Sequence, residues 1–123
     1  MTMSSNPRSL IFPKARRLSL TAEFNRVRTQ GKSIRGHLLI IGFLKTENEA
    51  FRAGFITSKR IGGAVVRNRV RRRLRDIVRT EQTRLRPGFW FVLIARPAAA
   101  RATFQELKDE WLRLAERASI LAP

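Results

Sequence analysis

One segment of the 123-residue chain, residues 65–85, has two faces of opposite chemistry. Apolar residues recur in it at helical spacing, and most of the positions between them are arginine. With about 3.6 residues per turn, the apolar side chains form one stripe and the arginines spread over the opposite arc. The stripe consists of Val66, Val70, Leu74, Ile77 and Val78. The segment is therefore predicted to be a helix that packs on a core with one face and presents guanidinium groups on the other.

The arginine face is too one-sided for an ordinary solvated helix surface. Like charges four residues apart destabilise a helix by roughly 0.2–0.5 kcal/mol per pair. Arg67, Arg71, Arg75 and Arg79 form successive pairs of this kind with no acid among them. The whole chain has 26 Lys+Arg and 9 Asp+Glu, a formal net charge of +17. Such a charge opposes compaction unless a polyanion is bound, so a nucleic-acid binder is the first expectation and a membrane-surface protein is the rival.

The sequence offers little support for a membrane protein. No run of about 18 apolar residues is present. The apolar stripe lacks the Trp and Phe side chains typical of interfacial helices, and residues 1–13 lack the long apolar core of a secretory signal. We expect a cytoplasmic protein with no membrane partner, a flexible N-terminal tail over residues 1–13 and a single domain over residues 14–120.

Residue composition also limits the catalytic chemistry of the chain. Cysteine is absent, which excludes disulfides, a thiolate zinc site and a cysteine nucleophile. The acidic residues are scattered along the sequence and give no sign of a protein nuclease centre. His37, the one histidine, lies in a strand pattern, where a structural or surface role is favoured over acid–base chemistry. No catalytic residue and no metal ligand are therefore predicted in the protein.

The first half of the chain predicts one helix and two strands. A helix is expected over residues 21–30, with Thr21 as its N-cap and Gly31 directly after its end. The apolar, partly β-branched stretches at residues 37–45 and 51–57 read as strands. A polar turn separates them, so the two strands are expected to form a hairpin.

The second half adds a strand and a helix after the arginine-rich segment. Pro87-Gly88 ends that segment, and residues 89–95 are unbroken apolar sequence, as in a central strand covered on both faces. Thr103 and Glu106 form a capping box that starts the last helix. One face of this helix is expected to carry Phe104, Leu107, Trp111, Leu114, Ala115 and Ala118. A helix between two strands favours an α+β sandwich of one sheet with helices on it.

A more specific motif surrounds the start of the arginine-rich helix. It comprises Ser58-Lys59-Arg60, Gly62, Ala64-Val65, Arg67-Asn68-Arg69 and Arg71-Arg72-Arg73-Leu74-Arg75. This motif resembles the signature of the bacterial ribonuclease P protein subunit. The order and spacing of the other elements are similar too, so the resemblance covers about residues 14–118. One departure is Gly63, where the family commonly has Asn.

The resemblance implies both a fold and a function. The fold is a two-layer α/β sandwich of α-β-β-β-α-β-α order, with an extra short strand within residues 33–45 and a left-handed β-α-β crossover, similar to a ribosomal-protein domain. General rules favour the right-handed form, so the handedness comes from the resemblance alone. The implied function is that of a small protein cofactor of a ribozyme that removes the 5′ leader of precursor tRNA. The RNA is expected to hold the catalytic groups and most of the Mg²⁺.

The resemblance also implies two RNA-binding surfaces in the one domain. Net charge fits two surfaces, being +7 over residues 1–36, +9 over residues 58–86 and close to zero elsewhere. The surface for the catalytic RNA falls on Lys59, Arg60, Arg67, Asn68, Arg69, Arg71, Arg72 and Arg75. The surface for the single-stranded leader is a cleft between the first helix and the sheet, assigned to Phe24, Arg28, Lys32 and Phe43.

Several alternatives remain open at this stage. Phe24 could instead be a core anchor paired with Val27, and Asn68 could make a local bond to the backbone at the helix start. Arg28 replaces an aromatic residue usual in the family, although a guanidinium can also stack on a base. At the level of function, a structural ribosomal RNA-binding protein or an RNA chaperone would carry the same charge. The sequence leaves the oligomeric state open.

Overall fold

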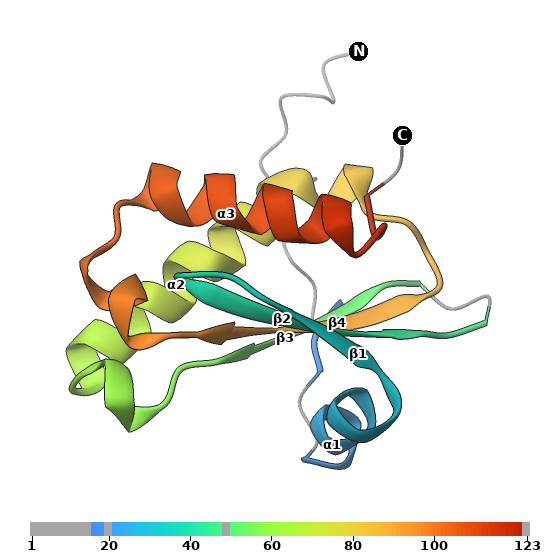
Figure 1. Ribbon diagram of the computed structural model, residues 1–123, viewed down its shortest axis with the longest axis horizontal. Helices are drawn as coiled ribbons and strands as arrows, with labels where there is room; N and C mark the ends of the chain where they lie inside the picture. Colours follow the sequence, from blue (N-terminus) through green and yellow to red (C-terminus); the bar gives the residue numbers. More distant parts are fainter. Residues whose placement is uncertain (1–15, 19–20, 48–49, 122–123) are drawn as a thin grey trace.

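The computed structural model describes residues 16–18, 21–47 and 50–121, so the predicted tail over residues 1–13 lies outside the described residues. The described residues form three α-helices, four strands and three short 3-10 turns (Figure 1). The helices are α1 (Thr21–Gln30), α2 (Ala64–Glu81) and α3 (Phe104–Arg117). The strands are β1 (Lys32–Arg35), β2 (Leu39–Lys45), β3 (Arg52–Ile56) and β4 (Phe89–Ala95). The 3-10 turns are η4 (Lys59–Ile61), η5 (Gln82–Arg84) and η6 (Pro97–Arg101). The predicted α+β class and α-β-β-β-α-β-α order are confirmed.

The strands form one sheet in the order β1-β2-β4-β3. β2 is antiparallel to β1 and β4, whereas β3 runs parallel to β4 and connects to it through α2. The predicted hairpin between residues 37–45 and 51–57 is therefore wrong. The more apolar strand β4 lies between β2 and β3, where helices on both faces cover its side chains. The hairpin joins β1 to β2 instead, and β1 confirms the extra short strand within residues 33–45.

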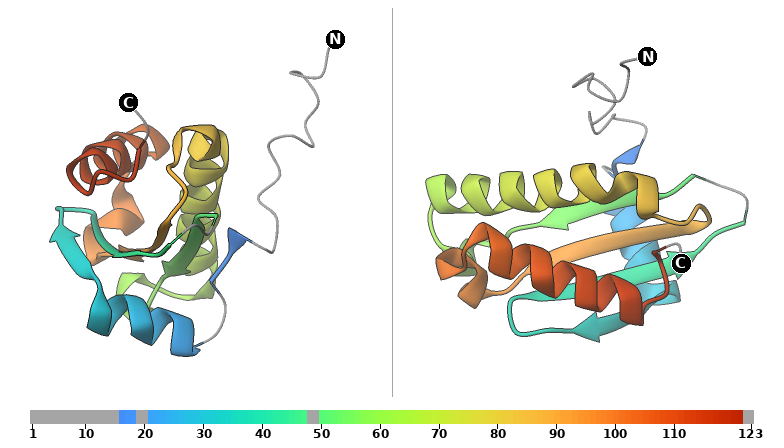
Figure 2. Two further views of the ribbon diagram at one scale, coloured as in Figure 1. Left: turned by 90° about the vertical axis from the view of Figure 1, so that its right-hand side faces the viewer. Right: turned by 90° about the horizontal axis from the view of Figure 1, so that it is seen from above.

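Helices cover the two faces of the sheet unequally. α2 and α3 lie side by side on one face, and α1 lies across the other (Figure 2). Alternation of side chains along β4 supplies both cores. Phe91 and Leu93 face α2 and α3, while Trp90 and Val92 face α1. The prediction of a central strand covered on both faces is confirmed.

The larger core is centred on an aromatic series beneath α3. The Phe91 ring lies 6.3 Å from that of Phe51 in a stacked arrangement and 6.2 Å from that of Trp111 edge-on. Phe91 and Trp111 are fully buried. The predicted apolar face of α3 is confirmed except at Phe104, which is 38% exposed because it occupies the first residue of the helix, beyond the edge of the core.

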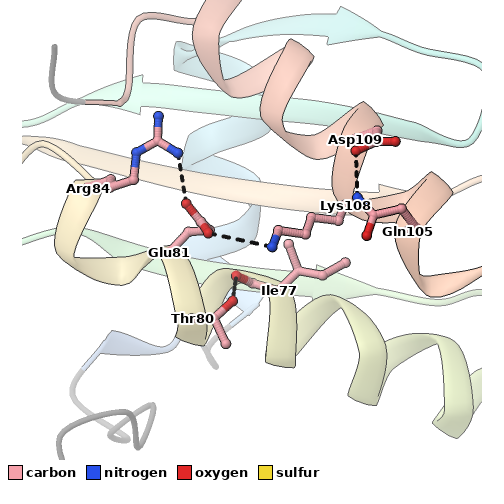
Figure 3. A network of polar contacts seen from close by, with 7 residues as sticks. All are labelled: Ile77, Thr80, Glu81, Arg84, Gln105, Lys108 and Asp109. Atoms are coloured by element: carbon pink, nitrogen blue, oxygen red, sulfur yellow. Dashed lines mark hydrogen bonds and ion pairs between the residues drawn. The ribbon is translucent and has the colours of Figure 1, made fainter. Parts of the chain in front are cut away.

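Local capping accounts for the ends of the two long helices. The Thr103 hydroxyl accepts a hydrogen bond from the Glu106 amide at 3.1 Å, and the Glu106 carboxylate accepts one from the Thr103 amide at 2.8 Å, which confirms the capping box. α2 ends at Glu81 rather than at the predicted residue 85, because its last turn tightens into η5. The Glu81 carboxylate lies 2.9 Å from the Arg84 guanidinium and 3.9 Å from the Lys108 ammonium. These ion pairs, drawn as dashed lines in Figure 3, join α2 to α3.

Candidate nucleic-acid interface

The apolar stripe of α2 packs on the sheet as the sequence predicts. Val70, Leu74, Ile77 and Val78 are fully buried, and Val66 is half-buried. Hydrophobic burial of this stripe fixes the rotation of α2 about its axis, so the opposite face, which carries the arginines, points away from the sheet. The prediction of a helix with one apolar and one guanidinium face is therefore confirmed, and the structure further separates the arginines into rows.

One row bonds the backbone that follows β4. Arg69 Nη2 donates to the carbonyl oxygen of Ala100 at 3.0 Å, and Arg73 Nη1 donates to that of Ala102 at 3.0 Å. These bonds tie α2 to η6 and to Ala102, the residue that follows it. A guanidinium has five N–H donors, so a single bond to a carbonyl leaves others for an external acceptor. Arg69 can therefore hold α2 against η6 and contact an external ligand at the same time.

A second row lies toward β3. Arg71 donates to the Thr57 hydroxyl at 2.5 Å and to the Asn68 side-chain oxygen at 3.2 Å. The Arg75 guanidinium lies over the Phe55 ring, 5.9 Å from its centroid. Burial lowers the pKa of Arg75, and the neighbouring positive charges of Arg17 and Arg71 lower it further, while Asp76 opposes them. This row therefore concentrates positive charge against the edge of the sheet.

Asn68 and Arg72 lie between the two rows and are exposed. The Asn68 oxygen accepts from the Arg71 side chain, so among the described hydrogen bonds it does not make the local backbone bond considered as an alternative. Within the part of the chain that the structure describes, Arg72 makes no hydrogen bond or ion pair, unlike Arg69 and Arg71. Arg72 is therefore the arginine of this face most available to an external phosphate.

The approach to α2 is a tight turn that carries Lys59 and Arg60. The Ser58 hydroxyl accepts a hydrogen bond from the Arg60 amide at 3.3 Å and caps η4. Gly62 follows with φ of 141°, a conformation that side chains disfavour. Lys59 and Arg60 are exposed, so the turn places both cations beside the start of the arginine helix.

Gly63, the departure from the family motif, is the N-cap residue of α2 and makes no side-chain capping bond. Its backbone is extended, with φ of −72°, and a Cβ added there would meet nothing within 4 Å. An asparagine oxygen can accept from the first amides of a helix. We therefore expect Gly63→Asn to raise the free energy of unfolding by about a few tenths of a kcal/mol. Urea unfolding would measure it, and a loss of stability would contradict the capping geometry.

A groove of about 290 Å³ lies on the other face of the sheet, between α1 and the strands. Its floor is apolar, and its rim carries the cations Arg28 and Lys32. Arg28 is held by a 3.3 Å hydrogen bond from its guanidinium to the Asn25 side chain. The lining residues are Phe24, Asn25, Val27, Arg28, Gly31, Lys32, Ser33, Ile40, Gly42, Ile56, Val92 and Ile94. The groove thus combines an aromatic ring, an apolar floor and rim charge.

α1, the helix that walls this groove, is fixed by charge as well as by packing. Glu23 of α1 forms an ion pair with Arg52 of β3, with 2.6 Å between their charged atoms. The guanidinium groups of Arg26 and Arg52 lie 5.1 and 5.2 Å from the centroid of the Trp90 ring. Together with buried Val27, these contacts set the position of the helix over the sheet.

Phe24 lies at one end of the groove against the backbone of β3. A Cβ added at Gly54 would lie 2.5 Å from the Phe24 ring, so glycine is what allows the ring to lie this close to the sheet. The ring also packs against the smaller core that contains Val27. Phe24 therefore combines the two roles considered from the sequence, being half-buried in the core and part of the groove lining.

Phe24, Arg28 and Lys32 line this groove, whereas Phe43 does not. Phe43 is instead the direct partner of Lys32 across β1 and β2, and the two line a separate hollow together with Phe89. Phe43 packs against the larger core, on the face of the sheet opposite the groove. Side chains alternate along β2, so Leu39, Ile41 and Phe43 share one face while Ile40 and Gly42 share the groove face. The floor residues missed from the sequence are Ile40, Gly42, Ile56, Val92 and Ile94. The period-two pattern of β2 and β4 is the signal that could have found most of them.

The described residues were also considered as a metal site and as a membrane span, and they fit neither. Over residues 16–18, 21–47 and 50–121, no group of three or more His, Cys, Asp or Glu side chains is placed to hold a metal ion. None of the helices described for this chain has the length and apolar character needed to cross a membrane.

Comparison with known proteins settles the family. The ribonuclease P family model matches residues 12–119, which is most of the chain. The chain belongs to the ribonuclease P protein family. It is 39% identical over 109 residues to the ribonuclease P protein component of Roseiflexus castenholzii, covering 88% of this chain and 89% of that protein. It is 40% identical over 109 residues to the component of Symbiobacterium thermophilum, covering 88% and 95%.

Solved structures of the family share the fold. The Staphylococcus aureus RNase P protein superimposes with a TM-score of 0.81 at 25% identity, covering 88% of this chain and 99% of that one. The Thermotoga maritima RNase P protein gives a TM-score of 0.75 at 28% identity, covering 82% and 96%. Membership of the family makes the chain an RNA-binding component of a tRNA-processing endoribonuclease, with RNase P RNA as its partner.

Proposed function

We propose that the chain binds both the catalytic RNA of ribonuclease P and the 5′ leader of precursor tRNA, and so assists Mg²⁺-dependent endonucleolytic removal of the leader to form the mature 5′ end. One observation carries this proposal. A helix rich in arginine covers one face of the sheet, and an apolar groove rimmed by cations opens on the other. Two RNA segments of different character can therefore be bound together.

The α2 surface suits a structured RNA. Guanidinium groups form forked hydrogen bonds to phosphate oxygens, and the two rows with Arg72 between them span a little less than two helical turns. The assigned contacts are Lys59, Arg60, Arg67, Asn68, Arg69, Arg71, Arg72 and Arg75. Binding through them is electrostatic, so its affinity should fall steeply with added salt.

The groove suits a single strand. Grooves of this class combine cations that follow the backbone with aromatic faces on which unpaired bases stack. Phe24 supplies the aromatic ring, while Arg28 and Lys32 supply rim charge. The planar Arg28 guanidinium can also stack on a base, which compensates for the missing second aromatic residue. The leader is accordingly assigned to Phe24, Arg28 and Lys32.

The catalytic centre and the Mg²⁺ ions are assigned to the RNA. In the described part of the chain, several acidic side chains already serve the fold. Asp76 pairs with Arg79, Glu81 with Arg84, and Glu106 caps α3. The acidic side chains within the described ranges do not gather into a group of three or more that could hold a metal ion. The protein's contribution is to bind and orient the two RNA segments.

Replacement of Phe24 by leucine tests the leader assignment. Leucine keeps an apolar side chain over Gly54 but removes the stacking face, and base–aromatic stacking is worth about 1–3 kcal/mol per base. We expect the holoenzyme's affinity for precursor tRNA with a long leader to fall by about tenfold, and its affinity for substrate with a one-nucleotide leader to stay unchanged. Fluorescence-detected binding titrations would measure both values.

Phe43→Leu is the matched control for this experiment. It makes the same chemical change at a ring that packs against the larger core and does not line the groove, so leader binding should be preserved. An equal loss for Phe24→Leu and Phe43→Leu would contradict the assignment of the leader to the α1 groove.

Titration of the protein into its RNA subunit and precursor tRNA, with leaders of increasing length, tests the proposed function as a whole. Affinity should rise with leader length until the groove is filled and then level off. A structural ribosomal protein or an RNA chaperone would show no dependence on the leader and would associate with ribosomal RNA equally well. That second outcome would refute the proposal.

A further inference from the structure

Glu110 of α3 is a buried carboxylate with an unusual set of partners. Its side chain reaches the β1–β2 turn, where Oε2 lies 2.7 Å from the Leu38 amide nitrogen and 2.6 Å from the Leu39 amide nitrogen. The residue is only 3% exposed, and its other oxygen lies 3.6 Å from the Arg113 guanidinium. Hydrogen bonds from amides to a carboxylate are stronger than those between neutral groups. The carboxylate therefore holds the first residues of β2.

The same turn is built to fit against this carboxylate. The Gly36 amide donates to the Leu39 carbonyl at 2.7 Å, and Arg96 donates to the Gly36 carbonyl at 2.7 Å. A Cβ at Gly36 would lie 2.6 Å from Glu110 Oε2, so only glycine lets the turn approach this closely. The Glu110 carboxylate thus accepts from the amides of the turn, while the Arg96 guanidinium donates to one of its carbonyls.

The turn directly follows the strand that forms one wall of the groove. β1 has four residues, stands at the edge of the sheet and pairs with β2 from Lys32 to Arg35. Its residues Lys32 and Ser33 line the groove, whereas Glu110 does not. A short edge strand has few bonds to fix its position, so its orientation depends on how its ends are held. Glu110 holds the end at which β1 turns into β2.

We infer that Glu110 is a positioning residue for the leader, acting through the β1–β2 turn to hold Lys32 and Ser33 at the groove. The inference rests on the proposed binding of the leader in that groove. It differs from a general role in stability, because it predicts that loss of Glu110 affects the leader more than any other part of the substrate.

The experiment measures a leader effect, defined as the ratio of holoenzyme affinities for precursor tRNA with a long leader and with a one-nucleotide leader. In Glu110→Leu both turn amides lose their acceptor, and the leader effect should fall about tenfold. Glu110→Gln keeps one acceptor oxygen and should retain most of the effect. Leu107→Val, a buried change on the same helix, controls for lost stability, which urea unfolding would measure for every variant.

Gly36→Ala perturbs the same contact from the other side and guards against misfolding of Glu110→Leu. It should also lower the leader effect, and the double variant should be no worse than Glu110→Leu alone, since both changes break one contact. The inference would be overturned if the leader effect were unchanged in folded Glu110→Leu and Gly36→Ala. It would also be overturned if Glu110→Gln or Leu107→Val lost the leader effect as fully as Glu110→Leu does. Absence of any leader effect in the wild-type holoenzyme would instead refute the proposed function on which it rests.

Discussion

Replacing Arg69 and Arg72 together by alanine is expected to lower the affinity for the catalytic RNA by about a hundredfold. Each guanidinium can donate charge-assisted hydrogen bonds to phosphate, worth about 1.5–3 kcal/mol per contact. The slope of log affinity against log salt should flatten by about one to two units, because two phosphate contacts are lost. Filter binding or fluorescence titration over a range of salt concentrations would give both quantities.

The two arginines should differ in a second measurement. Arg72 is exposed and makes no bond within the described part of the chain, so Arg72→Ala should leave the free energy of unfolding unchanged. Arg69 bonds the Ala100 carbonyl, so Arg69→Ala should also destabilise the fold, by about 1 kcal/mol. Comparing RNA affinity with urea unfolding for each single variant separates the two effects.

Lys108→Ala combined with Arg113→Ala is the control of equal charge. Both residues lie on α3, away from the arginine face, and their ion pairs with Glu81 and Glu110 are long, at 3.9 and 3.6 Å. This pair should change RNA affinity little. Equal losses from the α2 pair and the α3 pair would mean that the protein attracts RNA by net charge alone.

Phe91→Ala is expected to have the largest effect on stability. The ring is fully buried on the central strand, between Phe51 and Trp111. Truncation of such a residue removes apolar burial and leaves a cavity, at a cost of about 3–5 kcal/mol. This is a large part of the stability of an ordinary domain, so the variant should be mostly unfolded in moderate urea. Circular dichroism during urea unfolding would measure the change.

Phe104→Ala provides the matched comparison. It makes the same truncation at a phenylalanine that is 38% exposed, at the first residue of α3. We expect a loss below about 1 kcal/mol, since most surface substitutions change stability little. Similar losses at Phe91 and Phe104 would contradict the placement of the core.

Local signals in the sequence predict single elements well. Gly31 follows the last residue of α1, Pro87-Gly88 precedes β4, and Thr103 with Glu106 starts α3, all as the structure has them. The predicted N-cap of the first helix is wrong, because Thr21 is itself the first residue of α1. The strand order is different, because it depends on contacts between distant residues. The apolar strand β4 enters between β2 and β3, and nothing local to residues 37–57 reveals this.

In the candidate site, too, local sequence predicts some features, whereas others depend on contacts between distant residues. Helical periodicity places the arginines of α2 on one face, but it does not show which of them bond the backbone. The carbonyl that Arg69 reaches lies 31 residues away in sequence. The sequence offers Phe43 to the leader as an available aromatic residue, whereas alternation along β2 directs its ring toward the larger core. The roles of Glu110 and Gly36 arise from a contact between α3 and a turn more than 70 residues earlier.

Cleavage of precursor tRNA at low Mg²⁺ tests the central claim most directly. The protein is added to its cognate RNA subunit and a substrate with a long leader, and release of the leader is followed over time. We predict that the RNA alone is slow at this Mg²⁺ concentration, that the protein accelerates it, and that the product carries the mature 5′ end. Failure of the protein to accelerate the RNA, or cleavage by the protein after all RNA has been removed, would contradict the account.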